Sequence, residues 1–253
     1  MKQLLFIVLF TCSSFVFSQT SLPYKVGEYA TYRVSFGGIS VGYANLEINE
    51  VRPIKNTPSV HVIGKGRTAP FFDLFFKVRD VYETFIDTTT LLPLEFKRAV
   101  NEGGYLINQH YRFNHKENNV ATQDSMFIIP ANAQDMLSAF FYARTFKKDS
   151  IITRGTPIYI PIFMDDENYS LEIKYQKKEI LDTKWGKLDC MVFQPKMQEG
   201  RVFENGEEMK IWISDDANHL LVKVETKIWA GTIRAVLDDY KGLKYPLSII
   251  VEQ

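Results

Sequence analysis

The chain has few of the residues that usually mark a chemical site. Only two cysteines and four histidines occur among its 253 residues. The histidines, at positions 61, 110, 115 and 219, form no His-x-His, HExxH or His/Cys spacing, so the sequence predicts no metal site. The acidic stretch at 165–167 lacks the alternating acids and central glycine of a calcium loop. Since no phosphate-binding glycine loop occurs either, we predict no cofactor.

An excess of charge of one sign is also missing. The sequence has 30 basic and 30 acidic residues, and its formal net charge is zero. This balance predicts neither a nucleic-acid partner nor a polybasic segment for a membrane surface. After the N-terminal segment, no apolar run approaches the roughly eighteen residues that a transmembrane helix needs. We therefore predict no transmembrane span.

The N-terminus has the composition of an export signal. It reads "MKQLLFIVLFTCSSFVFSQ", with one lysine, an apolar run at 4–10 and then small and polar residues. We predict a signal peptide over 1–18, cleaved after Ser18, and a mature protein in the periplasm or secreted. Cys12 raises the alternative of a lipoprotein, which the bulky Phe10 and the neighbouring Thr11 disfavour.

Removal of this signal would leave Cys190 as the only cysteine. A single thiol forms no internal disulfide, so the exported domain would depend on its hydrophobic core alone. Cys190 lies in "GKLDCMVF", in step with Leu188 and Val192. We interpret it as a small buried hydrophobic residue rather than a reactive thiol.

Most of the mature chain alternates between apolar and polar residues. Tyr32, Val34 and Phe36, for example, alternate with Arg33 and Ser35. This pattern predicts half-buried antiparallel strands. Similar segments, separated by short polar turns, occur at 60–65, 78–86, 94–99, 105–113, 158–164, 186–193, 209–214 and 232–237. We predict an all-β fold with about a dozen strands, forming a large curved antiparallel sheet or a partly closed β-barrel in a single β-rich domain over 19–253.

One segment interrupts this alternation. In "PANAQDMLSAFFYARTF", apolar residues recur at helical spacing, and Pro130 and Asn132 supply a start. The sequence therefore predicts one main helix that packs against the sheet. Its stripe of methionine and phenylalanine is interpreted as core rather than as a cofactor site.

The stretch "GGISVG" at 37–42 contains the G-x-S-x-G pattern of hydrolases with a nucleophilic serine. That motif requires a helix after Ser40, yet the following residues alternate as a strand does. The apolar positions also change parity here, which predicts a bulge or sheet corner at Gly42. Asp165 and His219 follow Ser40 in hydrolase order, but both lie in turn-like stretches. We therefore predict a structural Ser40 and no catalytic residues.

Four phenylalanines crowd the segment "APFFDLFFKV". Phe71, Phe72, Phe75 and Phe76 would fall along one side of a helical turn, and Pro70 suits the start of such a turn. We predict a short helix whose phenylalanines border an apolar cavity and bind its ligand. Ordinary burial in the core is the alternative.

Four blocks of the sequence resemble one known family. They are "GEYATYRVSFGGISVGYANLEI", "VRDVYETFID…LLPLEFKRAVNEGGY", "DMLSAFFYAR" and "KIWISDDANHLLVKVETKIWAGTIRAVLDDY". Their order and spacing are similar to those of the domain of unknown function 3108 family. The resemblance implies an exported envelope protein of a two-membrane bacterium with a mostly antiparallel β architecture. It supplies no catalytic residues.

Three functions from different classes follow as hypotheses. The first is a non-enzymatic binding or carrier module for an apolar ligand such as a lipid, because a curved sheet with a helix across it can enclose a cavity. The second is a structural or protein-interaction component of the cell envelope. The third is a serine hydrolase that uses Ser40.

Overall fold

The computed structural model describes residues 22–147, 156–196 and 208–250, and the predicted signal peptide lies outside them. The described chain contains one short α-helix and one turn of 3-10 helix, η1, among fifteen strands. In order, the elements are β1 (Tyr29–Phe36), β2 (Ile39–Ile54), β3 (Thr57–Thr68), η1 (Phe72–Leu74), β4 (Arg79–Asp87), β5 (Pro93–Glu102), β6 (Tyr105–Asn114), β7 (Asn119–Ala121), β8 (Met126–Ile128), α1 (Met136–Ala143), β9 (Ile158–Met164), β10 (Glu167–Thr183), β11 (Gly186–Lys196), β12 (Glu208–Ser214), β13 (Leu221–Ile228), β14 (Gly231–Lys241) and β15 (Ile249–Ile250).

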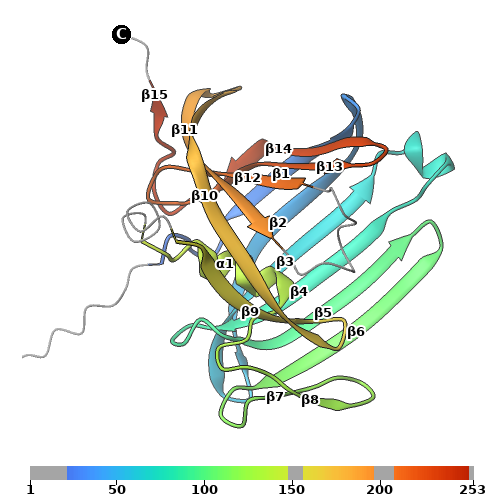
Figure 1. The fold of residues 1–253 in the computed structure, drawn as a ribbon, viewed down its shortest axis with the longest axis vertical. Coiled ribbons are helices and arrows are strands. Elements are labelled where there is room, and N and C mark those ends of the chain that lie inside the picture. Colours follow the sequence, from blue (N-terminus) through green and yellow to red (C-terminus); the bar gives the residue numbers. More distant parts are fainter. Residues whose placement is uncertain (1–21, 148–155, 197–207, 251–253) are drawn as a thin grey trace, which may run out of the picture.

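All fifteen strands belong to one antiparallel sheet (Figure 1). Its order is β8-β7-β6-β5-β4-β3-β2-β1-β14-β13-β12-β11-β10-β9, with β15 paired to β11. The sheet curves strongly but is not closed, since no ladder joins β8 to β9. An isolated bridge between Gln134 and Ile162 and a hydrogen bond from Asn168 to the carbonyl of Ile128 span this gap. The predicted curved antiparallel sheet is confirmed.

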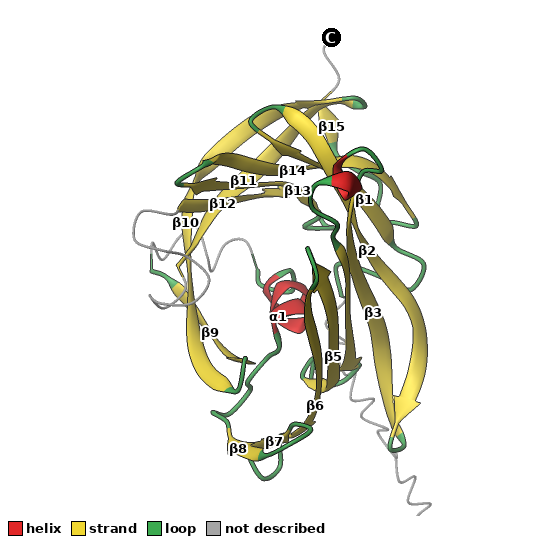
Figure 2. Ribbon diagram, turned by 90° about the vertical axis from the view of Figure 1, so that its right-hand side faces the viewer, coloured by secondary structure: helices red, strands yellow, loops and turns green. Residues whose placement is uncertain are grey.

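Helix α1 lies inside the curve of the sheet (Figure 2). It contacts β4 on one side and β9 on the other. Leu137 and Phe141 point into the largest core cluster, which also contains Phe96, Tyr111 and Phe163. Burial of this face stabilises so short a helix, because an isolated helix of this length is unstable in water. No helix in the described part of the chain is long and apolar enough to cross a membrane.

The start of α1 differs from the prediction. The N-cap is Asp135, not Pro130 or Asn132, and its side chain accepts hydrogen bonds from the backbone amides of Leu137 and Ser138. The Ser138 hydroxyl in turn accepts from the amide of Asp135, which completes a capping box. Pro130 and Asn132 belong instead to a turn that the amide of Ala133 closes by donating to the carbonyl of Pro130, and Gln134 then pairs with Ile162 of β9.

The buried Asp135 carboxyl predicts a pH dependence of stability. Burial raises its pKa from 3.8 to about 6, although hydrogen bonds, including one from the Thr84 hydroxyl, oppose the shift. Between pH 3.8 and about 6, the folded state therefore holds a proton that the unfolded state has released, so stability falls as the pH rises through this range. The wild type should lose about 3 kcal/mol of unfolding free energy between the two pKa values, and Asp135→Asn, which has no carboxyl to titrate, should not show this loss. The measurement is the difference in unfolding free energy between wild type and variant as a function of pH. A difference that does not change with pH would contradict this assignment.

A β-bulge is present where the sequence predicts one. Val34 pairs with Gly42 and Ser35 with Ser40, so Val41 has no partner in β1. After the bulge, Leu46 and Ile48 point into the core, while Tyr43 is exposed. The change of parity in the sequence therefore corresponds to this extra residue.

Candidate functional site

A cavity of about 310 Å³ lies between α1 and strands β9 to β12. This volume is at the lower end of the range of small-molecule pockets, roughly 300–1,000 Å³. Nearly all of the lining side chains in the described ranges are apolar, and none of these is a carboxylate. The cavity can therefore hold an apolar group without leaving a buried acid unpaired.

Methionines make a large contribution to the cavity wall. Four of the seven methionines of the chain line it: Met136, Met164, Met191 and Met209. Methionine is flexible and polarisable, so a wall rich in it adapts to ligands of different shape. The sequence pattern does not predict this wall, because the four methionines are dispersed over a helix and three strands.

The two faces of α1 serve different purposes. Leu137 and Phe141 pack in the core, whereas Met136 and Phe140 line the cavity. The predicted core role of the methionine and phenylalanine stripe is therefore correct for only part of it. Ala143, also on the cavity side, leaves space because its side chain is small.

Strand β11 is also covered on both faces. Met191 and Phe193 face the cavity, and the alternate residue Cys190 lies on the opposite face in a cluster with Trp212 and Val222. Cys190 is fully buried, and burial raises the pKa of its thiol to about 12. The interpretation of Cys190 as a buried hydrophobic residue is confirmed.

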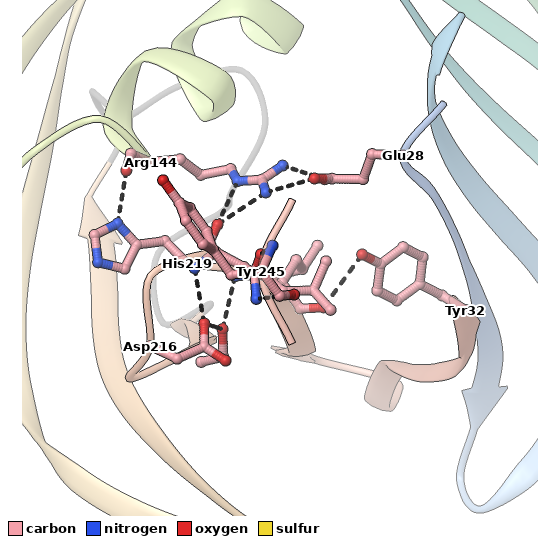
Figure 3. Close-up of polar contacts among 10 residues, drawn as sticks. Glu28, Tyr32, Arg144, Asp216, His219 and Tyr245 are labelled. Atoms are coloured by element: carbon pink, nitrogen blue, oxygen red, sulfur yellow. Dashed lines mark hydrogen bonds and ion pairs between the residues drawn. The ribbon is translucent and has the colours of Figure 1, made fainter. Parts of the chain in front are cut away.

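One end of the cavity is polar, and a buried ion pair organises it (Figure 3). Arg144, directly after α1, donates to both carboxylate oxygens of Glu28 at 2.6 and 3.1 Å, and both side chains are almost fully buried. The guanidinium also donates to the carbonyl of Asn218 and lies over the ring of Tyr24. Burial raises the pKa of Tyr24 to about 12. The ion pair thus connects the start of β1, the end of α1 and the β12–β13 turn.

His219 reaches the cavity from that turn. Its Nδ1 lies 2.6 Å from the carbonyl of Arg144, so Nδ1 carries a proton and donates. Asp216 shapes the turn by accepting from the Ser214 hydroxyl and the Asn218 amide. Asn218 in turn exchanges hydrogen bonds with the backbone of Tyr245 (Figure 3). The position of the imidazole therefore depends on its own hydrogen bond to Arg144 and on a turn that other hydrogen bonds hold in place.

The residues considered for a hydrolase lie in different surroundings. Ser40 is the second residue of β2, and a strand follows it as predicted. The carboxylate of Asp165 accepts from Arg98 and Gln109, in the β9–β10 turn. His219 lies at the cavity. Within the described ranges, no group of three histidine, cysteine or acidic side chains could hold a metal ion.

The four phenylalanines predicted to bind ligand do not line this cavity. Phe72 begins η1, which confirms a short helical turn, but Phe71, Phe75 and Phe76 are 65%, 75% and 54% exposed. They lie at the end of the sheet that also carries the β5–β6 turn, where Phe76 packs on Gly103. Core burial is therefore wrong for these three rings. Ligand binding by the four residues remains a prediction.

One solved structure shows the same type of fold. A β-barrel-like protein of the domain of unknown function DUF1849 from Brucella abortus matches with a TM-score of 0.58 at 8% identity, over 86% of this chain and 98% of that one. A lipoprotein candidate from Parabacteroides distasonis ATCC 8503 and an exported-protein candidate with a YmcC-like fold from Bacteroides fragilis NCTC 9343 match at a TM-score of 0.36. Their identities are 13% and 10%, and each comparison covers 87% of this chain and 97% or 98% of the other.

A family model identifies the chain more directly. No curated protein matches the sequence. The model of the family described as "Protein of unknown function (DUF3108)" matches residues 31–238, which include most of β1, all of β2 to β13 and most of β14. This match agrees with the resemblance of the four sequence blocks. The chain therefore belongs to the DUF3108 family.

Proposed function

We propose that this protein is an exported, non-enzymatic module that binds an apolar ligand in the cavity between α1 and β9 to β12. The observation that carries the proposal is the cavity itself, with its apolar, methionine-rich wall and a single polar end. Burial of apolar ligand surface would supply the binding energy. Export to the periplasm or beyond rests on the signal-like N-terminus.

Filling the cavity tests this function. We expect Ala143→Phe to place a ring in the space beside α1 and to weaken binding of N-phenyl-1-naphthylamine, a neutral fluorescent probe, by about tenfold or more. Fluorescence titration measures the dissociation constant. Native mass spectrometry of the protein from its own host would identify a co-purified ligand.

The control is Val51→Phe, which adds a similar ring at an exposed position of β2. This variant should bind the probe as the wild type does. Equal probe binding by both variants, with the fold intact by circular dichroism, would rule out this cavity as the binding site.

An interaction role in the envelope is the second candidate. Its support is the exposed apolar rim formed by Phe71, Phe75 and Phe76 with Leu106 and Trp229. The three phenylalanines lie in the β3–β4 connection, Trp229 in the β13–β14 turn and Leu106 at the start of β6, so all five are at one end of the sheet, where successive antiparallel strands return. Contiguous exposed apolar surface is typical of interaction sites. A rim of this kind is compatible with ligand binding in the separate cavity.

The proposal includes no catalysis by Ser40. A nucleophile elbow requires a strand, a strained turn and a helix, and the strand after Ser40 argues against this arrangement. Ser40→Ala should therefore leave any ligand affinity unchanged.

A further inference from the structure

His219 combines an unusual backbone conformation with an accessible ring nitrogen. Its φ is +46°, in the left-handed region that non-glycine residues rarely adopt. Such conformations are retained where the surrounding structure holds them and are frequent at functional sites. Nδ1 donates to the carbonyl of Arg144, and Nε2 points away from that network (Figure 3). His219 and Arg144 are the polar lining residues among those described, and the guanidinium of Arg144 is already engaged by Glu28 and Asn218, which leaves Nε2 of His219 as the polar group for a ligand.

The charges around this nitrogen leave room for an acidic head group. Arg144 lines the same end of the cavity, and Glu28 neutralises it from the far side. Asp216 is engaged by the hydroxyl of Ser214 and by backbone amides. Because no carboxylate of the described residues lines the cavity, a ligand carboxyl would meet no like charge among them.

We infer that the cavity takes a single-chain carboxylic acid, with the carboxyl group on Nε2 of His219 and the hydrocarbon chain along the methionine-rich wall. This inference rests on the proposed function and specifies its ligand class. One proton would lie between the carboxyl oxygen and Nε2, supplied by the neutral acid or by solvent when the carboxylate enters. Such a charge-assisted hydrogen bond is roughly twice as strong as a neutral one. The cavity volume of about 310 Å³ suits one chain with a compact head.

A pair of matched ligands tests the inference. Dodecanoate and methyl dodecanoate share their chain and carbonyl group, but the ester carries neither a charge nor a proton to share. We expect dodecanoate to displace N-phenyl-1-naphthylamine from the wild-type protein at about tenfold lower concentration than the ester, a ratio equivalent to about 1.4 kcal/mol. The measurement is the loss of probe fluorescence near neutral pH.

His219→Asn removes the imidazole at little cost to the backbone, because asparagine tolerates the left-handed conformation well. In this variant the two ligands should displace the probe equally, with the ester as effective as on the wild type. His110→Phe is the control, since His110 contacts Glu95 and does not line the cavity. It should keep the preference for the acid.

The outcomes separate this inference from the proposed function. A preference for the acid that survives in His219→Asn, or equal displacement by both ligands in the wild type, would overturn the role of His219 and leave apolar binding standing. Failure of the wild type to bind the probe or either ligand would overturn both. Should His219→Asn unfold in a thermal melt, His219→Gln provides the same comparison.

Discussion

Replacing Arg144 by methionine is expected to lower the free energy of unfolding by about 3–5 kcal/mol. The substitution leaves the carboxylate of Glu28 buried without its partner, and it removes the donors to the carbonyl of Asn218. Methionine fills similar space, so the loss is electrostatic rather than a cavity effect. Chemical denaturation monitored by circular dichroism measures it.

Two further variants test the cause of this loss. Glu28→Gln combined with Arg144→Met removes both charges, so it should recover part of the stability that Arg144→Met loses. Arg33→Met disrupts an exposed ion pair with Asp238 and should cost at most about 1 kcal/mol. If Arg144→Met is no more destabilising than Arg33→Met, the buried ion pair does not organise this end of the cavity.

Gly42→Val is expected to lower the free energy of unfolding by about 3 kcal/mol or more, which is the largest cost usually found for substitutions that overpack a site. A Cβ at Gly42 would lie closer than 3.0 Å to the carbonyl oxygen of Arg67, which belongs to the backbone of β3. A backbone atom in a ladder cannot move aside as a side chain can. The reason is thus a close approach at the bulge, not a positive φ.

Gly66→Val is the matched control for this substitution. Gly66 lies in the neighbouring strand β3 and has no positive φ. A Cβ at this position would meet only the side chain of Asp80, at 3.9 Å or more. We expect its melting temperature to stay near that of the wild type. A melting temperature for Gly42→Val as high as that of Gly66→Val would mean that the strands separate at the bulge without cost.

Local patterns predicted most of the elements of this fold. Alternation identified strands such as β1, because a strand with one face in the core buries every second residue. The bulge was also readable, since one inserted residue exchanges the faces of β2. The start of α1 was missed, because the competing extended conformation of Gln134 depends on its pairing with Ile162, a residue distant in the sequence.

The candidate site was much harder to predict. The phenylalanine-rich segment drew attention because its four rings are neighbours in sequence, yet they do not line the cavity. Met136, Met191 and Met209 come from three separate elements and share a wall only after the sheet has curved around α1. No local pattern distinguishes such residues from ordinary core positions.

The amino-acid sequence by itself determined the all-β class, the family, the one α-helix of the described residues and the burial of Cys190, because each depends on the pattern of residues along the chain. The tertiary structure alone decided that Glu28 meets Arg144 and that His219 reaches the cavity. These contacts join residues 116 and 75 positions apart. Their formation depends on the curvature of the whole sheet, which is the sum of twist and bulges over many strands.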